Sequence, residues 1–202
     1  MRSTAGSSWA VRVDQWPQRL DIALWLREFG RIAVPPGDTV PGPLDVPVPL
    51  WRNATGQSAG LTAGWLGWWN ALLSSQDRPT PGAAAAGQLA FDPPGFAGLD
   101  EWPELQDLVL AGWREANDWH QWRKETGLAA GHRHSMVVTR AIGELENRLG
   151  RRARPFTIAL TVLPVRETTV RQVAPDHFLV PERVYLGPDF PELMQSLAAP
   201  LA

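Results

Sequence analysis

Residues 155–162, Pro-Phe-Thr-Ile-Ala-Leu-Thr-Val, carry the clearest structural pattern in the chain. Large apolar side chains alternate with Thr and Ala, and this period of two is typical of a half-buried β-strand. Two short apolar segments follow at 170–173 and 177–180, with turn-forming residues between them. The pattern predicts a small, mainly antiparallel sheet at the C-terminal end, with a further strand at 183–186.

The N-terminal side predicts one more strand and then a helical region. Residues 9–13 alternate between apolar and other side chains, so this segment can join the C-terminal sheet. Helices are expected where apolar residues recur every three or four positions, at 17–30, 58–75, 100–126 and 135–150. Runs of helix beside runs of strand predict an α+β fold, with the helical N-terminal and central part packed on the sheet.

Glycine has two expected uses in these helices. Gly30, Gly127 and Gly150 stand where helix stops are expected. Gly60, Gly64 and Gly67 fall inside the second helix, where each weakens helix propensity by up to about 1 kcal/mol. Their presence suggests a close approach by another backbone.

Two irregular segments interrupt the pattern. Residues 35–49 contain six prolines, and their apolar residues alternate, which predicts an extended stretch over a hydrophobic surface. Residues 76–98 form a Pro-, Gly- and Ala-rich excursion longer than an ordinary loop. The length of 202 residues nevertheless suggests a single domain, 1–202.

Composition limits the classes of partner. A net charge of −2 gives no overall field for a polyanion or an anionic membrane, so we expect no nucleic-acid binding. A cluster of four arginines, Arg148, Arg151, Arg152 and Arg154, is better explained by its place at a helix C-terminus, with nucleic-acid contact as the alternative. No apolar run reaches the roughly 20 residues that span a bilayer, which favours a cytoplasmic protein without membrane association.

Residue types exclude several chemistries. The chain has no cysteine, which rules out disulfides, thiolate metal sites and cysteine nucleophiles. Phosphate-binding glycine loops and a nucleophile elbow are also missing, so no cofactor is predicted. Because Lys124 is the only lysine beside many arginines, the sequence suggests a GC-rich bacterial genome.

Eleven tryptophans are the most unusual feature. Each ring can bury on the order of 200 Å², which is too much apolar surface to leave in water. Three explanations stay open: a tryptophan-heavy core, a protein interface, or an aromatic ligand pocket. The candidate interface or ligand residues are Trp65, Trp68, Trp69, Trp113, Trp119 and Trp122.

The segment His132-Arg133-His134-Ser135 is the candidate chemical site. If a helix begins here, its free amides and dipole would favour an anion beside these side chains. Alternatively, the segment is a solvated loop with Ser135 as a cap. A metal is the third reading, with His120, Asp118 or Glu115 completing the ligands; the spacing is not diagnostic, and no metal site is predicted.

These observations favour a non-catalytic interaction or assembly component that associates with itself or with a protein partner. The aromatic excess and the missing catalytic motifs lead to this expectation. The alternative is an anion- or metal-dependent enzyme that binds a small molecule at residues 132–135.

Overall fold

The computed structural model describes residues 8–35, 37–51, 58–76 and 92–202, and within helices the side chains of 75–76 and 129–135 lie outside the description. Most of the predicted excursion at 76–98 therefore also lies outside it. The elements, in order, are β1 Trp9–Asp14, α1 Gln18–Phe29, α2 Ala59–Gln76, the 3₁₀ helix η1 Ala97–Leu99, α4 Pro103–Leu149, β2 Phe156–Leu163, β3 Arg171–Ala174, β4 His177–Pro181, α5 Glu182–Tyr185 and α6 Phe190–Ala198.

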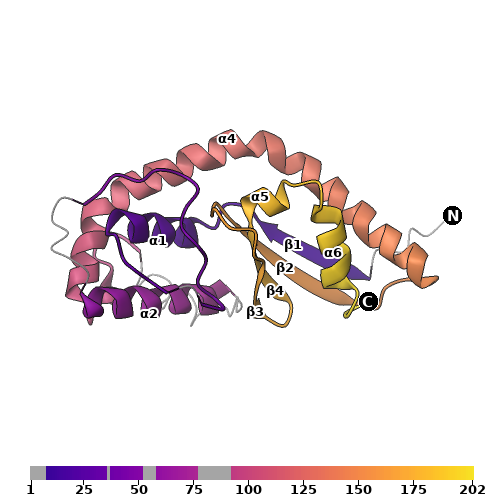
Figure 1. Ribbon diagram of the computed structural model, residues 1–202, viewed down its shortest axis with the longest axis horizontal. Helices are drawn as coiled ribbons and strands as arrows, with labels where there is room; N and C mark the ends of the chain where they lie inside the picture. Colours follow the sequence, from indigo (N-terminus) through magenta and orange to yellow (C-terminus); the bar gives the residue numbers. More distant parts are fainter. Residues whose placement is uncertain (1–7, 36, 52–57, 77–91) are drawn as a thin grey trace.

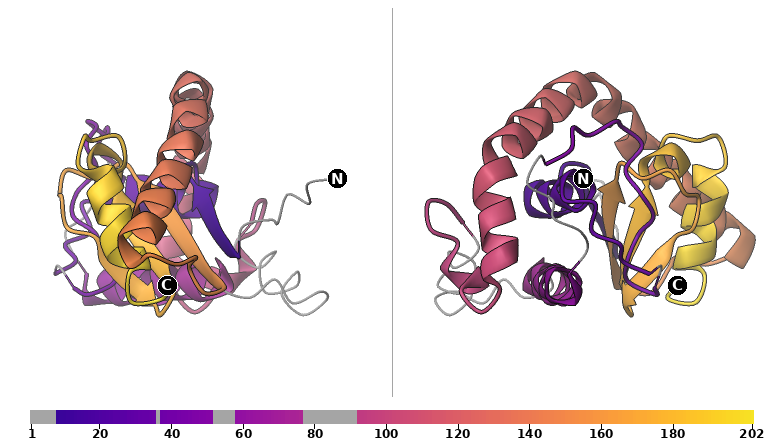
Figure 2. Two further views of the ribbon diagram at one scale, coloured as in Figure 1. Left: turned by 90° about the vertical axis from the view of Figure 1, so that its right-hand side faces the viewer. Right: turned by 60° about the vertical axis from the view of Figure 1, so that its left-hand side comes forward.

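Helix α4 organises the molecule. It arches over α1 and α2 at one end and over the sheet and α6 at the other (Figure 1). A turned view shows α1 and α2 beneath the concave side of this arch, next to the sheet (Figure 2). None of the helices in the described part of the chain combines the length and apolar character that a bilayer crossing requires.

The four-stranded sheet confirms the α+β class and the contribution of strands from both ends of the chain. Its order is β1-β2-β4-β3. Strands β1 and β2 are parallel, as are β2 and β4, and β3 pairs antiparallel with β4. The predicted predominance of antiparallel pairing is therefore wrong. The chain leaves β2, reaches the sheet edge at β3, and returns in a tight turn so that β4 lies beside β2.

The long helix α4 differs most from the sequence-based expectation. Two helices were predicted, with Gly127 ending the first, but α4 is continuous through this position. An added Cβ at Gly127 would lie 2.9 Å from Nε1 of Trp16, so glycine provides room for an indole ring and does not end the helix. The predicted stop at Gly150 is confirmed, with φ of 64° in the left-handed region. The strand predicted at 183–186 is wrong, since residues 182–185 form α5.

Two hydrophobic cores share α4. The helical core contains α1, α2 and the N-terminal half of α4. The sheet core contains β2, β4, α6 and the C-terminal half of α4. Whether the chain is one folding domain, as its length suggests, stays a prediction.

The Pro-rich segment forms an extended strap over α1, as predicted. Leu44 makes an antiparallel bridge with Val165, just after β2. Its burial decreases along the chain: Leu44 is 2% exposed and Leu50 is 50% exposed. The strap therefore covers apolar surface mainly at its N-terminal half.

Candidate functional site

A buried ionic cluster lies where the two cores meet. Oδ2 of Asp21 on α1 accepts hydrogen bonds from Arg123 Nη1 and pairs with His120 Nδ1, each at 2.9 Å. The second terminal nitrogen of Arg123 donates to Glu182 of α5 at 2.9 Å. His120 and Arg123 are three positions apart on α4, which places both on one helix face.

Burial controls the electrostatics of this cluster. Asp21, His120 and Arg123 are 0%, 2% and 7% exposed. Burial raises the pKa of Asp21 above its ordinary value, while the hydrogen bond from His120 and the charge of Arg123 oppose this shift. The cluster is not fully satisfied, because Asp21 Oδ1 and Arg123 Nε lack partners among the described residues.

The geometry assigns the cluster a structural role. A carboxylate that binds Nδ1 of a histidine is also found in catalytic dyads, where it orients the ring. Here the side chains of Asp21, His120 and Arg123 are covered, so a dissolved substrate does not reach them. Arg123 instead connects α1, the carbonyl of Gln15 and α5. The cluster ties the helical core to the sheet side of the molecule.

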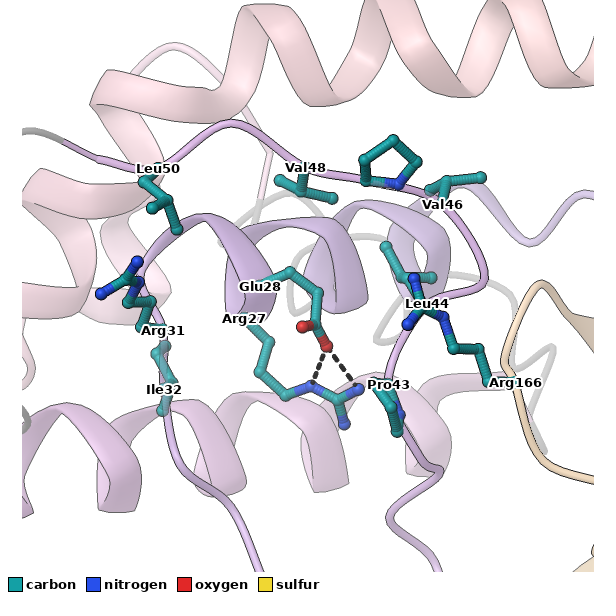
Figure 3. A pocket seen from close by; sticks show the side chains of 11 residues that line it. Arg27, Glu28, Arg31, Ile32, Pro43, Leu44, Val46, Val48, Leu50 and Arg166 are labelled. Atoms are coloured by element: carbon teal, nitrogen blue, oxygen red, sulfur yellow. Dashed lines mark hydrogen bonds and ion pairs between the residues drawn. The ribbon is translucent and has the colours of Figure 1, made fainter.

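The strap and α1 enclose a surface pocket of about 440 Å³ (Figure 3). This volume falls within the range of small-molecule sites. The Glu28 carboxylate points toward the guanidinium of Arg27, whereas Arg31 and Arg166 lie at opposite ends. Pro43, Val46 and Val48 contribute apolar surface.

The charged groups of this pocket are engaged in holding the strap. Arg27 donates to Pro41 O at 2.8 Å, to Gly42 O at 2.6 Å and to Glu28 at 2.9 Å. Burial lowers the pKa of Arg27, and Glu28 opposes the shift. Arg166 pairs with Asp45 at 3.5 Å. The pocket therefore has the size for a ligand, but its Arg27 and Glu28 groups serve the fold.

The outward side of α4 provides a different surface. Trp122 and Met136 are 59% and 69% exposed. Fourteen residues separate them, which at 3.6 residues per turn places them within about 40° on the helix. Asp118, Glu125 and Arg140 are also exposed, and all five positions fall within about 60° on the helix. We call these five residues the outer face of α4; it lies opposite the buried face, on the convex side of the arch (Figure 1).

The predicted tryptophan set divides into three environments. Trp65 and Trp69 are fully buried and stack with centroids 5.3 Å apart, and Trp68 is 3% exposed. Trp113 and Trp119 are half-buried against the helical core. Trp122 is the exposed member; the other tryptophans, all within the described residues, are buried or half-buried. Core packing thus accounts for most of the rings.

The segment 132–135 does not begin a helix. Its backbone lies inside α4, so the free amides and dipole end expected there are not formed. The side chains of His132, Arg133, His134 and Ser135 lie outside the described part of the chain, and their binding role stays a prediction. Of the proposed metal partners, His120 is bound to Asp21. The described residues contain no group of three or more side chains suited to a metal.

The C-terminal arginines are partly explained by local contacts. Arg148 donates to Gln195 of α6 at 2.5 Å, and Arg151 donates to the carbonyl of Ala202 at 2.8 Å. These contacts fasten the end of α4 to the C-terminal residues. They agree with the structural explanation of this cluster.

Sequence reasoning did not identify the ionic cluster or the clamp made by Arg27. A weak signal was present, because Asp21 and Arg27 fall within the apolar run of α1. Arg123 also falls on the apolar face of α4, one turn after His120. Charged residues on a core face indicate buried pairs, although their partners are not evident from local spacing.

No family model matches this chain, and neither does any curated protein or solved structure.

Proposed function

We propose that this chain is a non-catalytic assembly component that associates with a second copy of itself through the outer face of α4. The observation that carries the proposal is the exposure of Trp122. An indole ring that is 59% exposed leaves a large apolar area in water. Tryptophan is also enriched among the residues that contribute most to protein interfaces.

The other residues of the outer face support a protein partner. Met136 adds a flexible apolar side chain on the same side, and a thioether makes favourable contacts with aromatic rings. Asp118 and Glu125 lie on either side of Trp122 along the helix, and Arg140 lies one turn after Met136. Aromatic and methionine side chains are enriched in interfaces, and charged groups are found at their edges.

A second copy suits this surface because the outer face contains both members of each complementary pair. It carries an exposed aromatic ring and a thioether, and it carries acidic and basic groups. A self-complementary surface is what a two-fold dimer requires. The curvature of α4 limits the contact to the middle of the helix, so we expect a dissociation constant in the micromolar range, ~10 µM.

Sedimentation equilibrium over a range of protein concentrations tests this proposal. Wild type is expected to shift from monomer to dimer, and Trp122→Ala to weaken association about 30-fold, as for a hot-spot residue. Leu110→Ala is the matched control, because Leu110 is 51% exposed on α4 but lies away from the outer face. A wild-type protein that stays monomeric at hundreds of micromolar would overturn the proposal.

A further inference from the structure

We infer that the pocket between α1 and the strap binds a small-molecule carboxylate with an apolar chain. The carboxylate lies beside Arg166 at one end of the pocket, and the chain follows the strap toward Leu50. The inference goes beyond the proposed assembly role and uses none of the residues of the outer face.

The charge of the pocket is opposite to that of the chain. Three arginines and one glutamate are among its described lining residues, which gives this lining a net charge of +2. The whole chain has a net charge of −2. Arg27 and Glu28 neutralise each other, with Arg27 Nη2 2.9 Å from Glu28 Oε1. The excess positive charge therefore comes from Arg31 and Arg166, and it favours an anionic ligand.

Arg166 can exchange its anionic partner with little loss of free energy. Its Nε lies 3.5 Å from Asp45 Oδ1, which is longer than the roughly 2.7–2.9 Å of a close charge-assisted hydrogen bond. The two side chains are 58% and 45% exposed, so water screens their attraction. Asp45 is also paired with Arg183, at 3.2 Å. When a ligand carboxylate binds Arg166, Asp45 keeps this second partner.

The position of Arg166 decides which end of the pocket receives the carboxylate. Its backbone N–H donates to Pro43 O at 2.9 Å, and its side chain extends from there toward Leu44 (Figure 3). Arg31 lies at the opposite end, with its guanidinium directed away from Glu28 (Figure 3). A guanidinium anchored as in Arg166 can offer a carboxylate two parallel N–H donors.

The rest of the pocket suits an apolar chain. Val46 and Val48 line it, and Leu50 lies at the end opposite Arg166 with 50% of its surface exposed. The volume of about 440 Å³ is larger than a carboxylate group alone requires. A chain laid along these side chains removes apolar surface of both molecules from water. The ligand is therefore an acyl carboxylate and not a small inorganic anion.

A titration with octanoate, followed by ¹H–¹⁵N NMR, tests the site. Octanoate is expected to bind wild type with a dissociation constant of about 0.5 mM, given the size of the ligand. The backbone amide signals of Val46, Val48 and Arg166 are expected to shift. Octanamide, which has the same chain without the charge, is expected to bind about tenfold more weakly. No shift at these amides, or equal affinity for the two compounds, would overturn the inference.

Substitution of Arg166 tests the carboxylate end. Arg166→Gln is expected to weaken octanoate binding about tenfold, and Arg166→Lys only about threefold, because lysine keeps the charge but loses the paired donors. Arg114→Gln is the matched control, since it removes an exposed positive charge on α4 that does not line the pocket. Equal weakening by Arg114→Gln and Arg166→Gln would show that only the overall charge matters, and the assigned site would be wrong.

Chain length tests the apolar end. Decanoate, with two more methylene groups, is expected to bind about fivefold more tightly than octanoate, and Leu50→Ala to weaken decanoate binding about threefold. Decanoate binding no tighter than that of octanoate would contradict a chain held along the strap. Far-ultraviolet circular dichroism checks the fold of each variant, which is expected to be intact because Leu50 and Arg166 are exposed.

The exposed ring of Trp122 is an alternative place for an alkyl chain to bind. Trp122→Ala is expected to leave the dissociation constant of octanoate unchanged, and a loss of binding in this variant would overturn the pocket assignment. The two proposals fail separately. A monomeric wild type that shows the expected amide shifts overturns self-association alone, and a dimer without these shifts overturns the ligand site alone.

Discussion

The two cores on either side of α4 are filled by different kinds of side chain. The helical core contains four tryptophans that are at most 3% exposed: Trp25, Trp65, Trp68 and Trp69. The sheet core contains no tryptophan among its buried members in the described residues. It is built from aliphatic side chains, three smaller aromatic rings and small residues such as Ala141 and Ala198.

This difference follows from the elements that each core must join. Strands β2 and β4 present a regular surface on which aliphatic side chains interlock, and alanine lets α4 and α6 approach closely. The helical core must instead fill the space between two helices, an arch and the irregular strap. Large rings with one polar atom suit this task, because Trp65 and Trp69 donate to the carbonyls of Ala23 and Thr39, both at 2.9 Å.

The largest expected effect compares one buried ring from each core. Trp65→Ala is expected to lower the free energy of unfolding by about 5 kcal/mol, and Phe190→Ala by about 3 kcal/mol. Both residues are at most 1% exposed. Trp65 additionally loses its hydrogen bond, its stack on Trp69 and the guanidinium of Arg27 over its ring.

Urea unfolding followed by far-ultraviolet circular dichroism gives both values without relying on tryptophan fluorescence. Trp122→Ala, in the monomer, is the control and should change the free energy of unfolding by less than about 0.5 kcal/mol. If Trp65→Ala and Phe190→Ala lower the free energy of unfolding equally, the hydrogen bond from the indole N–H of the tryptophan contributes little.

The second effect concerns the junction between the cores. Arg123→Met is expected to lower the free energy of unfolding by about 3 kcal/mol. The substitution removes one of the two partners of the buried Asp21 carboxylate, and it removes the ion pair between α4 and α5. Arg114→Met, an exposed change on the same helix, should be nearly neutral. If the two variants unfold at the same urea concentration, the cluster does not couple the cores.

The sequence predicts the local elements well but does not predict how they are arranged in space. The strand at 156–163, the helices α1 and α2, and the extended strap follow local spacing and turn residues, and the structure confirms them. Local spacing could not show that β4 returns beside β2, because strand order depends on long-range pairing. It also could not distinguish a glycine that ends a helix from one that makes room for Trp16.

The same limit applies to the candidate site. Spacing places Trp119 and Trp122 only about 60° apart on α4, so which of the two rings is covered depends on the rest of the fold. Asp21 and His120 are 99 positions apart, so no local pattern relates them. The exposed indole was therefore within the predicted set, whereas the buried cluster was missed.

A third prediction uses two glycines on α2. An added Cβ at Gly64 would lie 2.9 Å from the ring of Trp102, whereas Gly67 has no atom within 4 Å. The expected close approach is thus made by a side chain, and at Gly64. Gly64→Ala should lower the free energy of unfolding by about 1–3 kcal/mol, because the added methyl group overpacks the contact with Trp102. Gly67→Ala should raise the free energy of unfolding by up to about 1 kcal/mol through its higher helix propensity. Opposite signs in thermal unfolding would confirm tight packing on one side of α2 only; a stabilising Gly64→Ala would contradict it.

The last expected effect concerns the sheet core and its single tyrosine, Tyr185. Burial raises the pKa of Tyr185 from 10.0 to about 12. Because the folded-state pKa lies above that of the unfolded chain, the folded protein holds this proton more tightly. The free energy of unfolding therefore falls as the pH rises from about 10 toward 12, and below pH 10 this group leaves stability unchanged.

Tyrosinate absorbance reports this residue alone, since the tryptophans do not titrate in this range. A folded-state midpoint near 10, equal to that of the urea-unfolded chain, would show that the sheet core admits water at Tyr185 and is less tightly closed than the tryptophan-filled helical core.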